Sequence, residues 1–165
     1  MSLVDALIPE FDHEMTSTRH VLERIPEQRF DWKPHSKSYS LGALATHVAT
    51  LPTWGVEALN RSDIDIGSNP PNPLVPSKIE ILAAFDRNVA NARAALVGRT
   101  DAELLATWSL KRNGKTVFTM PKTAVLRSFV LNHLIHHRAQ LTVYLRLLDV
   151  PVPSIYGPSA DEPAF

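Results

Sequence analysis

The sequence has 165 residues, with 17 basic and 17 acidic side chains and no cysteine. This length fits one domain spanning residues 1–165, and the even charge balance argues against nucleic acid or an anionic membrane as a partner. Because cysteine is absent, disulfide bonds, thiolate metal ligands and a cysteine nucleophile are excluded, and any bound metal must be held by nitrogen or oxygen atoms.

Apolar residues recur at steps of three and four over residues 4–25, a spacing that predicts an amphipathic helix. Pro9 either lies in the first turn of this helix or kinks it, because proline lacks the amide proton that an interior turn requires. Residues 26–39 contain two prolines and scattered charges, so they predict a connecting loop.

A second helix is predicted from Ser40, which caps it, to about Asn60, with a bend at Pro52. The stretch over residues 61–76 is rich in proline and too long for a tight turn. We therefore expect it to be a crossover connection between helix ends.

Two capping boxes follow, each with a hydroxyl residue three positions before a glutamate. Ser77 with Glu80 opens a third helix, which Gly98 ends, and Thr100 with Glu103 opens a short one. The third helix carries an apolar stripe and is expected to face a core.

Residues 108–120 predict a β-hairpin, because the dipeptide Asn113-Gly114 suits a type I′ turn. Pro121 then opens the last long helix, whose apolar periodicity continues almost to the proline-rich residues 151–165. That final segment predicts an extended tail lying on the domain.

Together these elements predict an all-α fold, a four-helix bundle with a small β-hairpin near residues 108–120. Each long amphipathic stripe needs apolar partners, and a bundle supplies them most simply. The N-terminal segment has no basic run and no apolar stretch of signal-peptide length, and no later segment approaches the length of a membrane span. We therefore expect a cytoplasmic protein.

Three histidines stand close together in the last predicted helix: His133, His136 and His137. At about 100° per residue, the apolar stripe lies on the side of His137, with His133 at its edge and His136 turned away. His133 and His137 are therefore the pair that faces inward. Side chains four residues apart on a helix are close enough to chelate one ion. His136 is expected at the surface or between helices, and Arg138 is expected to form a salt bridge.

His47, on the second predicted helix, shares a face with Leu44 and Leu51 and is the candidate third ligand. Each of the three histidines is also explained as a hydrogen-bonded core residue, because imidazole is often partly buried. However, two neutral imidazoles inside an apolar stripe leave ring nitrogens that must be satisfied, and an ion does so at small desolvation cost. The spacing alone leaves both interpretations open. The remaining histidines are expected in solvent or in a loop: His13, His20 and His35.

Other chemistries find less support in the sequence. The last helix has no Glu-x-x-His motif of the di-iron type, and the chain has neither a Gly-rich phosphate loop nor a Gly-x-Ser-x-Gly elbow. Tyr39, Trp54 and Tyr156 either line the substrate side of the histidine site or serve packing and anchoring of the tail.

The sequence resembles the DinB-like superfamily of helical bundles, which includes bacillithiol S-transferases and mycothiol-dependent enzymes. The resemblance rests on residues 40–47 (SLGALATH), 132–141 (NHLIHHRAQL) and 151–162 (PVPSIYGPSADE). It covers nearly the whole chain and implies that His47, His133 and His137 bind nickel or zinc and that the protein forms a homodimer. Ala139 departs from the family, in which many members carry glycine at this position.

Three neutral histidines leave coordination positions open, which is typical of catalytic and not of purely structural sites. A metal there could acidify a bound water, giving a hydrolase, or deprotonate an incoming thiol, giving a transferase. The resemblance favours a transferase in which a low-molecular-weight thiol attacks a small electrophilic substrate, and the thiol must come from a cofactor because the chain has no cysteine. The non-enzymatic alternative is a metal-binding stress or interaction module. No catalytic residue beyond the metal ligands is predicted.

Overall fold

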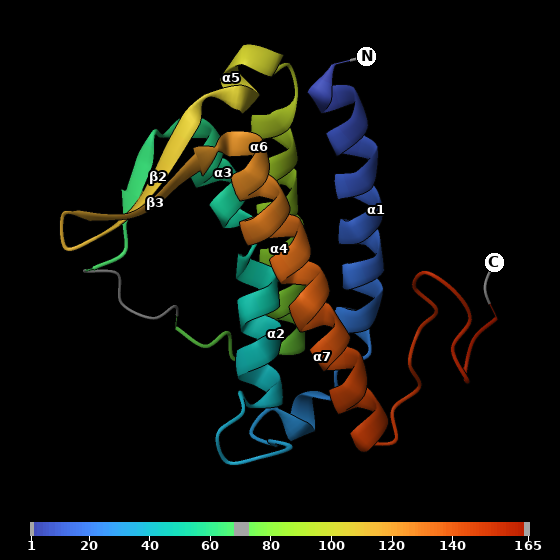
Figure 1. The fold of residues 1–165 in the computed structure, drawn as a ribbon. Helices are drawn as coiled ribbons and strands as arrows, with labels where there is room; N and C mark the ends of the chain where they lie inside the picture. The colour runs from blue at the N-terminus through green and yellow to red at the C-terminus, as the bar shows by residue number, and fades with distance from the viewer. Residues whose placement is uncertain (1, 68–72, 164–165) are drawn as a thin grey trace.

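The structure, a computed structural model, describes residues 2–67 and 73–163, which are mostly helical with a small β-sheet at one end (Figure 1). The main helices are α1 (Leu3–Glu23), α2 (Leu41–Thr50), α3 (Thr53–Asn60), α4 (Lys78–Leu96) and α7 (His133–Leu147). Both α1 and α2 pack against α4 and α7, so the apolar core lies between these helices. The predicted helical architecture is confirmed in this broad form.

The described residues contain more helices than the four long ones and the short one that were predicted. The second predicted helix is divided, because α2 ends at Thr50 and α3 begins at Thr53, on either side of the bend expected at Pro52. The short helix predicted after Thr100 is present as α5 (Asp101–Leu105). The last predicted helix begins after Pro121 with α6 (Lys122–Val125), and a 3₁₀ turn at Glu27–Arg29 is an addition to the prediction. Pro9 lies inside α1 and beyond its first turn, where its ring is exposed.

The predicted hairpin is present and belongs to a larger sheet than expected. Strand β2 (Thr107–Arg112) pairs antiparallel with β3 (Lys115–Pro121), and β1 (Asp63–Asp65) pairs parallel with β2. The prediction of an all-α bundle with a small hairpin is therefore corrected to a mostly helical fold with a three-stranded sheet. The start of the predicted crossover of residues 61–76 forms a strand, while residues 68–72 of that prediction lie outside the described residues.

The turn between β2 and β3 is fixed by backbone conformation and by a carboxylate from β1. Asn113 and Gly114 both have positive φ angles, 50° and 76°, as a type I′ turn requires. The carboxylate of Asp65 accepts hydrogen bonds from the amides of Asn113 at 2.9 Å and Gly114 at 2.6 Å. The hydrogen bond from the Gly114 amide, followed by those from the Gly67 and Asn113 amides, holds the pKa of Asp65 below its usual value. The two from the turn tie the hairpin to β1.

Replacing Gly114 with alanine should destabilise the protein by about 1 kcal/mol, because a side chain disfavours the left-handed backbone conformation at this position. No heavy atom lies near a β-carbon added here, so the cost is conformational and not steric. Gly157→Ala is the matched control, since its added β-carbon also meets nothing and its φ is not left-handed. Urea unfolding of both variants measures the effect; equal stability of the two variants would contradict the explanation.

The capping predictions hold fully at one site and partly at the other. Thr100 and Glu103 form the reciprocal capping box before α5, with each side chain bonded to the other residue's backbone amide. Ser77 accepts a hydrogen bond from the amide of Glu80, but its own hydroxyl, and not its amide, donates to the Glu80 carboxylate. Ser77 therefore caps α4 without the reciprocal bond.

The last helix was predicted to be continuous from Pro121, and the structure divides it into three segments, of which the middle one is π-helical and the other two are α-helical. After α6 comes η2, a π-helical segment over Leu126–Asn132, and only then α7. A π-helix places its hydrogen bonds one residue further apart than an α-helix and is frequent near functional sites. This segment ends directly before His133.

The tail over residues 151–163 forms neither helix nor strand, but it is not extended throughout as predicted, because it bends at residues 155–157 and 160–162. Residues 164–165 lie outside the described part of the chain. The tail runs beside the helices from the end of α7 (Figure 1). In the described residues, no helix has both the length and the apolar character needed to cross a membrane.

Candidate metal site

Helix α2 directs His47 toward the interior. The helix begins after Ser40, whose hydroxyl accepts a hydrogen bond from the Ala43 amide at 3.2 Å. Leu44 and Val48 are fully buried on the faces around His47. Packing of these apolar neighbours fixes the rotation of the short helix, and the imidazole is left half-buried, facing α7.

Helix α7 supplies the second and third imidazoles from one face. His133 is its first residue and His137 lies one turn later, while Leu134 and Leu141 are fully buried. His137 is buried and only 9% exposed, whereas His133 is half-buried. The predicted order, with His137 inside the apolar face and His133 at its edge, agrees with these exposures.

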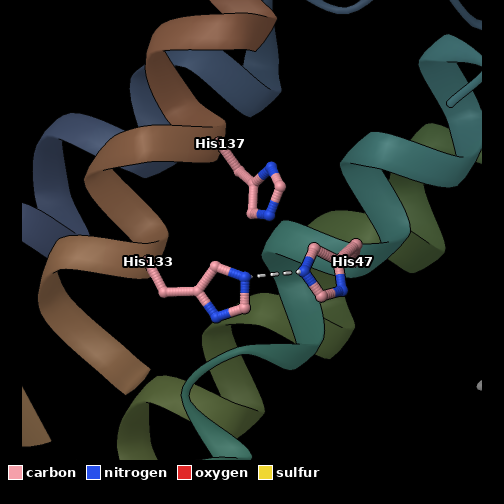
Figure 2. Close-up of side chains that lie close together, drawn as sticks. All are labelled: His47, His133 and His137. Carbon is pink, nitrogen blue, oxygen red and sulfur yellow. Dashed lines mark hydrogen bonds between the residues drawn. The ribbon is translucent and has the colours of Figure 1, made fainter. Parts of the chain in front are cut away.

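The three rings converge across the gap between α2 and α7 (Figure 2). Their centroids are 5.1 Å apart for His47 and His133, 4.6 Å for His47 and His137, and 4.7 Å for His133 and His137. One nitrogen from each ring lies within 4.8 Å of the other two. Within the residues that the structure describes, these histidines form the one group of three or more side chains arranged to hold an ion.

The separation of the ring nitrogens suits metal coordination. The Nε2 atoms of His47 and His133 are 3.3 Å apart. Two imidazole nitrogens bound to a tetrahedral zinc ion at about 2.0–2.1 Å would lie about 3.3 Å from each other. A small movement of the His137 ring would bring the third nitrogen to the same distance, so the donor set fits a divalent ion.

Burial keeps the three imidazoles neutral near pH 7. Desolvation, with a smaller effect from the other two rings, lowers the pKa of His47 from 6.5 to about 4. Desolvation is also the main cause that lowers the pKa of His133 and of His137. Neutral imidazole is the form that binds metals, so the lone pairs of this site are available at physiological pH.

The metal-free protein should lose stability as the pH falls from about 6.5 toward 4. The unfolded chain protonates His47 near pH 6.5, whereas the folded chain does so only near pH 4. Between these values the unfolded state binds more protons, so the free energy of unfolding decreases on acidification. Urea titrations across this window measure the slope. The His47→Gln variant should show a shallower slope, and an equal slope in both proteins would contradict the assignment.

Gln140 and His136 surround His137, and sequence reasoning missed the role of the glutamine. Gln140 Oε1 lies 2.7 Å from Nδ1 of His137, and Gln140 Nε2 lies 3.2 Å from Nε2 of His136. His136 is exposed, as expected, with its ring 4.8 Å from that of His137. The available signal was the position of Gln140, one helical turn after His137.

Of the aromatic residues considered as substrate-lining, Tyr39 lies at the histidines. Its ring stacks on His47 at 6.0 Å and meets His137 edge-on at 6.5 Å, while 55% of the residue remains exposed. Its carbonyl accepts a hydrogen bond from the Tyr144 hydroxyl at 3.2 Å, which holds the loop end in place. Trp54 instead packs near Phe129, with ring centroids 6.4 Å apart, in a separate aromatic cluster.

Arg138 forms the predicted salt bridge, but in the interior. The guanidinium is 1% exposed and pairs with the Glu14 carboxylate of α1 at 2.7 Å. It also donates to the Glu14 carbonyl, to Thr18 Oγ1 and to the Tyr156 hydroxyl. Tyr156 donates in turn to the Glu14 carboxylate at 2.8 Å. Tyr156 is therefore a tail anchor, which was one of the two roles considered for it.

The remaining histidines lie apart from the site. His13, His20 and His35 are exposed, as predicted. His13 stacks on Tyr156, with ring centroids 6.2 Å apart. His35 lies in the loop before α2, where its Nδ1 accepts a hydrogen bond from the Lys37 amide at 3.2 Å.

The chain resembles known proteins both in sequence and in fold. The family model of the DinB family matches residues 1–164. The Bacillus subtilis (strain 168) protein named "Uncharacterized protein YrdA" is 26% identical over 161 residues, which are 96% of this chain and 91% of that protein. A crystal structure of a DinB-like protein from Bacillus cereus ATCC 10987 has a TM-score of 0.73 at 22% identity, covering 92% of this chain and 97% of that one.

A more distant structural neighbour is a mycothiol-dependent maleylpyruvate isomerase. Its TM-score is 0.52 at 11% identity, and the similarity covers 90% of this chain but 62% of that protein. At these identities the structural likenesses establish the fold alone.

Proposed function

This chain belongs to the DinB family, and from that premise we propose that His47, His133 and His137 bind one divalent metal ion, nickel or zinc, for a thiol-transfer reaction. The observation that carries the proposal is the convergence of three neutral imidazoles from two helices, with ligand nitrogens within 4.8 Å of one another. Imidazole donors suit both metals. A bound ion would supply Lewis acidity, lowering the pKa of a thiol that reaches an open coordination position.

The residues of the chain define what such a site accepts. Three neutral histidines contribute no negative charge, so the charge of a divalent ion stays uncompensated and favours an anionic ligand such as a thiolate. The chain has no cysteine, so the thiol must belong to a small cosubstrate. Tyr39, stacked on His47 and largely exposed, stands where a ligand entering from solvent would pass.

One structural neighbour supports thiol chemistry over hydrolysis. The maleylpyruvate isomerase that shares the fold is mycothiol-dependent by its name, so this architecture serves a thiol-dependent reaction in at least one protein. The transfer of that chemistry to this chain is our proposal. The substrate would be a small electrophile attacked by the thiol.

Two measurements test the proposal. Elemental analysis of protein purified without a histidine tag should find about one nickel or zinc ion per chain. Metal-loaded protein should then show thiol-dependent turnover with a panel of low-molecular-weight thiols and electrophiles, and the His137→Ala variant should not. His20→Ala, which removes an exposed imidazole of α1, should retain the activity of the unchanged protein.

The possible outcomes separate the candidate functions. Turnover without a thiol would indicate a hydrolase and contradict the transferase proposal. A bound metal that neither supports turnover nor binds added thiols or anions would indicate a metal-binding module. Protein that binds no metal would contradict every form of the proposal.

A further inference from the structure

Gln140 is placed to control the chemistry of the His137 ring. It follows His137 by three residues on α7, so both side chains lie on neighbouring faces of one turn. Its Oε1 atom is 2.7 Å from Nδ1 of His137. This distance is that of a short, well-formed hydrogen bond.

The contact determines which nitrogen of His137 carries the proton. An amide oxygen can only accept, so the Nδ1 atom facing it must be the donor. In a neutral imidazole the other nitrogen, Nε2, then has the free lone pair. Because Nδ1 faces Gln140, Nε2 is the atom turned toward His47 and His133.

The amide nitrogen of Gln140 has a partner of its own in His136. Gln140 Nε2 is 3.2 Å from His136 Nε2, and an amide nitrogen only donates, so the His136 ring accepts. If the amide were reversed, its nitrogen would face His137 and force the His137 proton onto Nε2, pointing at the other two rings. Such a proton would block coordination at the centre of the site.

On the basis of the proposed metal site, we propose that Gln140 is a positioning residue that holds His137 as the Nδ1–H tautomer with Nε2 directed at the ion. Partners of this kind fix the ring orientation of a ligating histidine and raise its basicity. Gln140 acts only through His137.

The test combines nitrogen NMR of the imidazole rings with zinc titration. Spectra of ¹⁵N-histidine-labelled, metal-free protein near pH 7.5 report the tautomer of each ring, and the His137 signals are identified by their loss in His137→Gln. The unchanged protein should show His137 as Nδ1–H. Gln140→Leu should lose this preference and bind zinc about 10–100-fold more weakly in competition with a chelator.

Two further variants separate positioning from packing. Gln140→Glu keeps an oxygen acceptor for Nδ1 and should retain the tautomer. It should bind zinc at least about tenfold more tightly than Gln140→Leu does. Gln28→Leu makes the same change at an exposed site on the turn of residues 27–29 and should leave both readouts unchanged. Circular dichroism verifies that each variant is folded.

Several results would overturn the inference. An Nε2–H tautomer of His137 in the unchanged protein would do so, as would a Gln140→Leu variant with unchanged tautomer and unchanged zinc affinity. If the unchanged protein binds neither zinc nor nickel, the proposed function fails. The tautomer in the metal-free spectra still decides whether Gln140 positions His137.

Discussion

His47→Ala should reduce zinc affinity by more than about 100-fold, because the loss of an outer partner of a ligand already costs about 10–100-fold and this change removes a ligand. His47 is the one member of the group contributed by α2, and its Nε2 lies 3.3 Å from that of His133. Without it, only the two imidazoles of α7 remain. Competition titrations with a chromophoric chelator, at one fixed pH, give the ratio of dissociation constants.

A control is needed to separate loss of a ligand from loss of folded structure. His20→Ala removes an exposed imidazole from α1 and should bind zinc like the unchanged protein. Metal-free His47→Ala should keep the circular dichroism spectrum of the unchanged protein, because the leucine and valine neighbours of His47 still bury α2. Equal zinc affinity in His47→Ala and the unchanged protein would exclude His47 as a ligand.

Glu14→Gln should destabilise the protein by about 3–5 kcal/mol, because it leaves the guanidinium of Arg138 buried without a counter-charge. The two side chains are 2.7 Å apart and nearly inaccessible to solvent. Glutamine has the same shape as glutamate, so the effect reports charge and not volume. The midpoint and slope of urea unfolding give the loss in the free energy of unfolding.

The matched control for this change is Glu23→Gln, which removes a carboxylate that pairs with Arg19 at the surface of α1. Exposed pairs contribute about 0–1 kcal/mol, so this variant should be close to the unchanged protein. A double variant, Glu14→Gln with Arg138→Met, should recover part of the lost stability, because no buried charge is then left unpaired. Similar losses for Glu14→Gln and Glu23→Gln would contradict a special role of the buried pair.

The helices and the hairpin were predictable because their signals are local. Periodic apolar residues, the hydroxyl caps and the Asn113-Gly114 turn each depend on a few neighbouring residues, and the helical regions and the hairpin appear where expected, although two of the predicted helices are divided. Strand β1 was missed because three residues are too short for a periodic pattern, and their pairing with β2 is parallel and distant in sequence. The π-helical turn at Leu126–Asn132 has no sequence signal comparable to proline or a cap.

The same distinction applies to the candidate site. The spacing of His133 and His137 placed them on one face without a structure, and the flanking leucines oriented His47 toward them. The contacts of Arg138 could not be foreseen, because Glu14 lies 124 positions earlier in the sequence. Only the packing of α1 on α7 brings the two side chains together. Gln140 was missed because the inward histidines were considered as ligands only, without asking what holds each ring.

The tail of residues 151–163 is tied to the helices by contacts of two different kinds. Its end is held by exposed pairs, Glu162 with Arg24 and Asp161 with Arg146, whereas Tyr156 joins the buried pair of Glu14 and Arg138. Ionic strength screens exposed charges strongly and buried ones weakly. In concentrated salt residues 161–163 should therefore detach, while the Tyr156 hydroxyl stays bonded to Arg138 and Glu14, so that the segment separates from the helices only as far as Tyr156.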